Sequence, residues 1–127
     1  MIEIRKVQEE DMARAICAQG KLEWKPEYHV IATVEGKNVL ISAVFTYENE
    51  VGEILVIDGF DGDLAMLDGL CRAILNIMDI NGVKDVYLPL KYTDLARKIG
   101  FQANEDRFYL PLEGFFKCGC CGSRGDV

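Results

Sequence analysis

The clearest hydrophobic pattern of the chain lies between residues 53 and 101. Residues 54–57 are an unbroken apolar run of β-branched and leucine side chains, which predicts a strand covered on both faces. The segment Leu64–Ile80 repeats apolar residues at the spacing of one helical face, which predicts a mostly buried helix. Asn81-Gly82 ends that helix, and residues 83–90 predict a second strand. Because two strands joined through a helix form a crossover unit, we expect both strands in one sheet.

The rest of the pattern completes an α/β (α+β) fold. Within the long helix we expect Cys71, Ile74 and Leu75 to be almost wholly buried. Strands are predicted at 2–7, 28–34, 39–47, 51–57, from 101 and at 107–112, with helices at 9–20 and 92–99. The less regular stretch 21–27 leaves room for one short helix. The expected fold is therefore a single domain with a mixed sheet, in the order β-α-(α)-β-β-β-α-β-α-β-β.

Composition and charge narrow the function classes. Half of the 127 residues are hydrophobic, enough for one domain with its own core. A net charge of −7 argues against binding nucleic acid through its phosphates and against an anionic membrane surface. No apolar run approaches the roughly 20 residues that span a bilayer, and the first residues do not read as a signal peptide. Five cysteines, three of them crowded near the end, do not form a secreted disulfide framework, so we expect a cytoplasmic protein.

The element order and one local motif resemble the GNAT-type N-acyltransferase superfamily. Leu95-Ala96-Arg97-Lys98-Ile99-Gly100-Phe101 is similar to that family's leucine-tyrosine-x-lysine-x-glycine-phenylalanine helix end, and Ile2–Met12 is similar to its opening strand and acidic turn. The resemblance covers about residues 1–112, and we place the GNAT-like domain at 1–116 and a Cys/Gly-rich, flexible tail at 117–127. It implies acetyl-CoA or another acyl-CoA as donor, a primary amine as acceptor, and direct transfer without a covalent enzyme intermediate.

The resemblance also implies where the coenzyme would bind. In the family, backbone N–H groups of the turn after the meander wrap the pyrophosphate at a helix N-terminus. The implied cofactor-binding residues here are Ile57, Asp58, Gly59, Phe60, Gly62 and Asp63, and a donor slot is expected between the strand ending at Ile57 and the strand through Pro89. The turn carries three aspartates and no arginine, glutamine or lysine, so we expect coenzyme binding of roughly millimolar affinity. The aspartates could instead cap the helix and face solvent, or offer oxygens to a hard cation.

The implied catalytic machinery is incomplete. The family's tyrosine, which protonates the departing thiolate, would fall at Ala96, and alanine cannot donate a proton. Tyr92, one helical turn earlier, is the nearest replacement, and Cys71 and Tyr87 are others, although a tyrosine there more often packs than catalyses. The only histidine, His29, fits a structural or surface role better than a nucleophile-base pair. Trp24, Tyr28 and Tyr47 could line an acceptor pocket or pack in the core.

The tail offers a separate chemistry. Cys118, Cys120 and Cys121 place three thiols within four residues, and thiolates are soft ligands that suit zinc, copper(I) or an iron–sulfur fragment. A closed tetrahedral zinc site needs four ligands, so Cys17, Cys71, a second chain in a homodimer or a partner protein would have to complete it. A tail that binds no metal explains the same residues equally well.

Two functions therefore compete. One is a GNAT-type acyl-CoA-dependent N-acyltransferase of unknown acceptor, with a degenerate coenzyme loop and weak or absent activity. The other is a non-catalytic GNAT-like binding or regulatory module whose cysteine-rich tail binds a soft metal. The expected partners are small molecules, an acyl-CoA and an amine.

Overall fold

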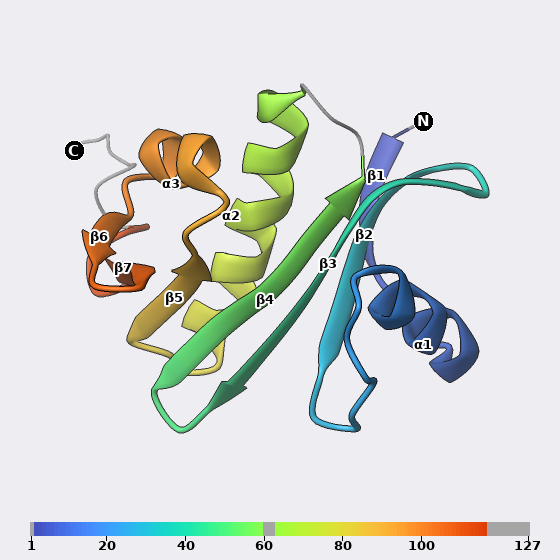
Figure 1. Cartoon of the computed structure of the whole chain (residues 1–127), viewed down its shortest axis with the longest axis horizontal. Helices are drawn as coiled ribbons and strands as arrows, with labels where there is room; N and C mark the ends of the chain where they lie inside the picture. The colour runs from blue at the N-terminus through green and yellow to red at the C-terminus, as the bar shows by residue number, and fades with distance from the viewer. Residues whose placement is uncertain (1, 60–62, 117–127) are drawn as a thin grey trace.

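The structure, a computed structural model, describes residues 2–59 and 63–116, and within them one seven-stranded sheet packs against three helices (Figure 1). The elements are β1 (Ile2–Lys6), α1 (Glu10–Gln19), β2 (His29–Glu35), β3 (Asn38–Glu48), β4 (Val51–Gly59), α2 (Leu64–Ile80), β5 (Asp85–Pro89), α3 (Thr93–Ile99), β6 (Gln102–Asn104) and β7 (Arg107–Pro111). The short helix left open for residues 21–27 does not form, because these described residues are turns and irregular backbone.

The sheet is mixed, as the pattern predicted. Its strand order is β1-β2-β3-β4-β5-β7-β6, and all neighbours are antiparallel except the parallel pair β4–β5. The chain crosses from β4 to β5 through α2, then places β6 at the edge and returns with β7 beside β5. The meander and the crossover unit therefore meet at the β4–β5 pair, in the middle of the sheet.

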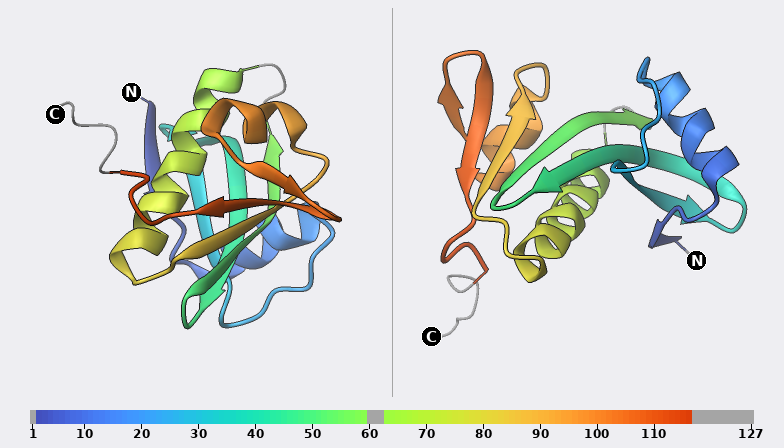
Figure 2. Two further views of the ribbon diagram at one scale, coloured as in Figure 1. Left: turned by 90° about the vertical axis from the view of Figure 1, so that its left-hand side faces the viewer. Right: turned by 90° about the horizontal axis from the view of Figure 1, so that it is seen from below.

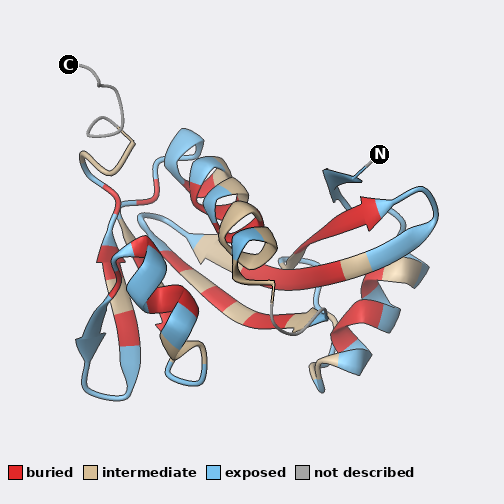
Figure 3. Ribbon diagram, turned by 90° about the horizontal axis from the view of Figure 1, so that it is seen from above, coloured by how far each residue is buried: buried red, intermediate tan, exposed pale blue. Residues whose placement is uncertain are grey.

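The helices cover both faces of the sheet. Figure 2 shows α1 and α2 on opposite faces, and α3 packs beside α2. Leu70, Cys71, Ile74, Leu75 and Met78 of α2 are wholly buried, which confirms the prediction for Cys71, Ile74 and Leu75. The exposed residues of α2 form the opposite stripe of the helix (Figure 3). The amphipathic period of the sequence therefore places α2 correctly on the sheet.

The apolar run of β4 is buried from both sides. Ile54 and Ile57 belong to the cluster under α2 and α3, whereas Val56 belongs to the smaller cluster under α1 with Val30 and Val44. No helix in the described ranges, 2–59 and 63–116, is both long and apolar enough to cross a membrane.

Candidate functional site

The strands β4 and β5 pair over only part of their length. The parallel register joins Val51 to Asp85, Gly52 to Val86 and Glu53 to Tyr87 and then stops, although β4 continues to Gly59. Figure 1 shows the two strands diverging beyond that point. Two-thirds of β4, residues 54–59, is therefore a strand edge that no described strand neighbours on the β5 side.

A bulge in β4 accompanies this divergence. Phe45 of β3 faces Ile54 of β4, and Val44 faces Val56, so Leu55 is one extra residue on β4. A bulge bends its strand and increases the local twist. It begins two residues after the last β4–β5 pair, and we attribute the turning of β4 away from β5 to it.

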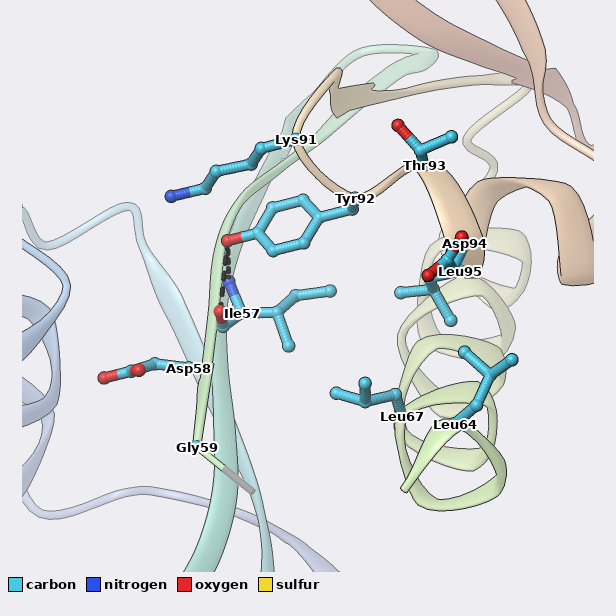
Figure 4. A pocket seen from close by; sticks show the side chains of 10 residues that line it. All are labelled: Ile57, Asp58, Gly59, Leu64, Leu67, Lys91, Tyr92, Thr93, Asp94 and Leu95. Carbon is cyan, nitrogen blue, oxygen red and sulfur yellow. Dashed lines mark hydrogen bonds between the residues drawn. The ribbon is translucent and has the colours of Figure 1, made fainter. Parts of the chain in front are cut away.

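A cavity of about 420 Å³, here called the slot, lies between the end of β4, the start of α2 and the turn and helix that follow β5. Side chains of α2 and α3 form its apolar side, and the turn before α3 forms its rim (Figure 4). Its lining residues are Ile57, Asp58, Gly59, Leu64, Leu67, Lys91, Tyr92, Thr93, Asp94 and Leu95. The slot lies beside the end of β4, where the sequence predicted it, but among its described lining residues none belongs to β5, because the turn at Lys91 and α3 form the other wall.

Tyr92 reaches across the slot to the open edge of β4. Its hydroxyl accepts a hydrogen bond from the Ile57 N–H at 2.7 Å and donates one to the Ile57 carbonyl at 3.0 Å. Both bonds are drawn in Figure 4. The single hydroxyl thus supplies the acceptor and the donor that a neighbouring strand would have offered to Ile57.

The acidic turn does not place all its carboxylates in the slot. The Asp63 carboxylate caps α2 and accepts a hydrogen bond from the Met66 N–H at 3.0 Å. Asp58 is still part of β4, paired with Ser42, and its carboxylate points away from Leu64 and Leu67 (Figure 4). Asp58 lines the slot through β4, and its expected place beside a bound phosphate stays a prediction. Capping by one aspartate had been the simpler interpretation of the turn.

The other implied cofactor residues have different outcomes. Ile57 and Gly59 line the slot with Asp58, and Asp63 lies at its helix start. Phe60, Asp61 and Gly62 lie outside the described residues, as do Cys118, Cys120 and Cys121 of the tail. Within the described part of the chain, no three His, Cys, Asp or Glu residues come together in a group that could hold a metal ion.

The alternative catalytic candidates lie away from the slot. Cys71 is wholly buried in the core, and burial raises the pKa of its thiol to about 12, with Asp68 adding to the rise. Such a thiol is inert at neutral pH. His29 stacks on Tyr47 and Phe45, with ring centroids 4.9 and 5.2 Å away, which fits the structural role expected for it. Ala96 is wholly buried in α3.

The opposite face of the sheet carries the predicted alternative acid Tyr87 and two residues that the sequence analysis did not single out, Glu53 and Arg107. Glu53 and Arg107 form an ion pair of 3.2 Å, and the Arg107 guanidinium lies 4.0 Å from the ring centre of Tyr87. These residues line a second cavity of about 210 Å³, which begins where the β4–β5 pairing ends. Arg107 reaches Glu53 only because β7 returns beside β5. The sequence around either residue does not predict this contact.

The predicted aromatic residues divide between two further hollows. Tyr28 and Tyr47 line one cavity of about 320 Å³ together with Glu53. Trp24 lines a different cavity next to α1, where the Arg14 guanidinium lies 4.4 Å from its ring centre. Tyr28 borders both cavities, whereas Tyr47 borders only the one that holds Glu53 and Trp24 only the one next to α1.

Comparison of the sequence with models of protein families finds no match, and comparison with curated proteins finds none. Solved structures do match. The ribosomal-protein-S18-alanine N-acetyltransferase of Escherichia coli superposes with a TM-score of 0.68 at 12% identity, covering 88% of this chain and 94% of that one. An N-acetyltransferase from Staphylococcus aureus Mu50 gives 0.67 at 13%, covering 89% and 99%. A GNAT family acetyltransferase from Brucella melitensis, in complex with acetyl-CoA, gives 0.67 at 16%, covering 87% and 88%. This chain has a GNAT-like fold.

Proposed function

We propose that this chain, on its GNAT-like fold, is an acyl-CoA-dependent N-acyltransferase whose donor binds in the slot. The observation that carries the proposal is the incomplete β4–β5 pairing, which leaves the end of β4 without a neighbouring strand beside the cavity, where only the Tyr92 side chain pairs with the Ile57 backbone among the described residues. An extended arm containing amides can pair with such an edge as an added strand would. The apolar side chains Leu64, Leu67 and Leu95 then pack against the arm.

The amine acceptor approaches from the opposite face, beside Glu53. The cavities on the two faces lie on either side of the place where strand pairing stops, so donor and acceptor can meet there. The amine nitrogen attacks the thioester carbonyl carbon, and the carbon–sulfur bond breaks. Glu53 takes the proton that the amine loses, and the departing thiolate takes one from Tyr92, the acid predicted from the sequence.

The helix start gives limited support to the coenzyme's phosphates. Leu64 and Ala65 have N–H groups without acceptors inside the helix, as at any helix start, but Asp63 already engages Met66 and adds a negative charge. We therefore propose weak donor binding, with a dissociation constant of roughly millimolar. Lys91 at the rim is the cation among the described slot-lining residues.

Calorimetric titration with acetyl-CoA tests the donor site. Leu67→Trp fills the slot and is expected to abolish binding, whereas Ala65→Trp, on an exposed part of the same helical turn, is the matched control and retains it. Binding that survives Leu67→Trp unchanged places the donor elsewhere and rejects the proposal.

Acetylation of a panel of primary amines, followed by mass spectrometry, tests the reaction. Glu53→Gln is expected to lower kcat by about 10²-fold or more, the usual range for loss of a general base. Glu35→Gln removes a more exposed carboxylate far from the cavity and keeps the rate.

The second candidate function is a non-catalytic binding module. Two observations favour it: the acid position of the resembled family holds the buried Ala96, and the Tyr92 hydroxyl already occupies the β4 edge. In that case the tail cysteines, Cys118, Cys120 and Cys121, bind zinc and no amine is acetylated. Thiol labelling of the full chain under reducing conditions distinguishes the binding module from the acyltransferase. Added zinc slows the labelling of these cysteines only if they bind it.

A further inference from the structure

The open edge of β4 presents one complete pair of backbone groups to the slot at Ile57. Its N–H and its carbonyl both face the Tyr92 hydroxyl, at 2.7 and 3.0 Å. Ile57 is 9% exposed, so water would reach these groups poorly if Tyr92 were absent. A buried backbone group without a partner is costly, which gives the Tyr92 hydroxyl a defined task in the empty slot.

An amide group lying along β4 would need the same two atoms. Its carbonyl would accept from the Ile57 N–H, and an N–H of the arm would donate to the Ile57 carbonyl. The Tyr92 hydroxyl and such an arm therefore exclude one another at Ile57. The apolar side of the slot remains available to either occupant.

Tyr92 is placed so that it can leave without unfolding an element. It precedes the first residue of α3, and it is only partly buried between the exposed Lys91 and the half-buried Thr93. The turn that carries it is held by other bonds, from the Tyr92 N–H to the Pro89 carbonyl at 3.3 Å and from the Thr93 hydroxyl to the Leu90 carbonyl at 2.9 Å. Rotation of the side chain alone frees Ile57.

We propose that Tyr92 is an internal competitor of the donor, and that its hydroxyl must leave the Ile57 backbone before an amide-bearing arm can bind in the slot. This inference rests on the proposed function, because it takes the acyl-CoA arm as the ligand. It adds a determinant of donor affinity within the chain itself. Tyr92 thus closes the β4 edge when the slot is empty and makes the slot selective for ligands that offer both an amide donor and an amide acceptor.

The test compares Tyr92→Phe with the unmodified protein. The phenylalanine ring keeps the packing and removes the hydroxyl, so the ligand no longer displaces two hydrogen bonds, and we expect coenzyme A and pantetheine each to bind about tenfold more tightly. Pantetheine lacks the nucleotide phosphates, so its affinity reports the slot alone. Tyr109→Phe is the matched control, because its hydroxyl bonds to Asp85 at 2.7 Å on the other face of the sheet, and donor affinity stays unchanged.

Amide hydrogen exchange gives a second readout that needs no ligand. In the free protein we expect the Ile57 N–H to exchange much faster in Tyr92→Phe than in the unmodified chain, and to be protected again when pantetheine is added. Unchanged or weaker affinity in Tyr92→Phe, with the unmodified protein still binding coenzyme A, overturns the competitor role and leaves the proposed function standing. Absence of binding by both proteins to both ligands rejects the proposed function, and the competitor role with it.

Discussion

Asp63 holds the first turn of α2 through its side chain. The carboxylate accepts from the Met66 N–H at 3.0 Å, and α2 has no acidic residue in its own first turn. Asp63→Ala is expected to lower the free energy of unfolding by about 1 kcal/mol, and Asp63→Asn to keep most of it, since asparagine caps as well. Urea denaturation of the three proteins measures the difference. Equal stability of the alanine variant would show that the cap contributes nothing.

His29 makes stability depend on pH. Burial, and then the positive charge of Lys6, lower the pKa of this imidazole below its usual 6.5. The unfolded chain therefore binds a proton at a higher pH than the folded chain, so the contribution of neutral His29 is complete above pH 6.5 and is lost as pH falls through the folded pKa. Between pH 7.5 and 5, we expect the free energy of unfolding to fall less in His29→Gln than in the unmodified protein.

Urea midpoints at the two pH values give that comparison. The neighbours that set the effect are the stacked rings of Tyr47 and Phe45 and the Lys6 ammonium. Parallel pH slopes for the variant and the unmodified protein would contradict the assignment to His29.

At the scale of elements, an added methyl group is expected to have opposite effects on stability at two glycines, one at the end of β4 and one inside α2. Gly59 ends β4 with φ +137°, and a Cβ there would lie 2.5 Å from the Leu40 carbonyl oxygen of β3. Gly59→Ala combines backbone strain with a contact against rigid backbone, so we expect a loss of about 2 kcal/mol or more. Gly69 lies inside α2, where an added Cβ would have no described neighbour within 4 Å outside its own helix backbone, and Gly69→Ala is expected to gain about 0.5–1 kcal/mol.

Thermal denaturation monitored by circular dichroism measures whether each variant is less or more stable than the unmodified protein. Each glycine variant serves as the control for the other. A stabilising Gly59→Ala would mean that the end of β4 can move away from β3. The slot would then lack the fixed edge on which the proposed donor site depends.

The helices and strands were largely predictable from the sequence, whereas the strand ends and the bulge in β4 were not. Leu64–Ile80 is the same helix in the pattern and in the structure, because seventeen residues of amphipathic period carry a strong signal. The predicted strand 83–90 shrinks to Asp85–Pro89, since strand ends depend on partners. The slot was expected between these elements, but the bulge at Leu55 was not, because a bulge depends on the register with β3 and leaves no mark in composition.

At the scale of the whole molecule, contacts distant in sequence decide the candidate site. Tyr92 meets Ile57 across 35 positions, and Arg107 meets Glu53 across 54. Tyr92 was singled out as a replacement acid because it lies one helical turn before Ala96, and that role stays a prediction. Its bonds to Ile57 could not be predicted, because they depend on the angle at which β4 leaves β5. The pairing of Arg107 with Glu53 required the strand order β5-β7-β6, which hydrophobic periodicity does not specify.

Net charge leads to a prediction about how the coenzyme arrives. The chain carries −7, and coenzyme A is itself anionic, so the two repel at long range. Raising ionic strength from 10 to 150 mM shortens the screening length from about 30 to about 8 Å, and we expect the association rate of coenzyme A to rise. Stopped-flow binding measures it, with uncharged pantetheine as the control ligand. A rate that falls with salt would show that the local charge of Lys91 dominates.

The extra residue in β4 has a consequence for how such a site is encoded. Leu55 is one extra residue between the paired positions Ile54 and Val56. Its presence creates the bulge, and its side chain matters less. The opening in the sheet therefore depends on the number of residues in β4 more than on their identity. A substitution in β4 leaves the number of residues unchanged. Deletion of Leu55 would instead make Ile54 and Val56 neighbours, in register with Phe45 and Val44. The strand β4 could then run straight beside β5. Because we attribute the turning of β4 to this bulge, we expect gain or loss of this one residue to open or close the slot with every other amino acid unchanged.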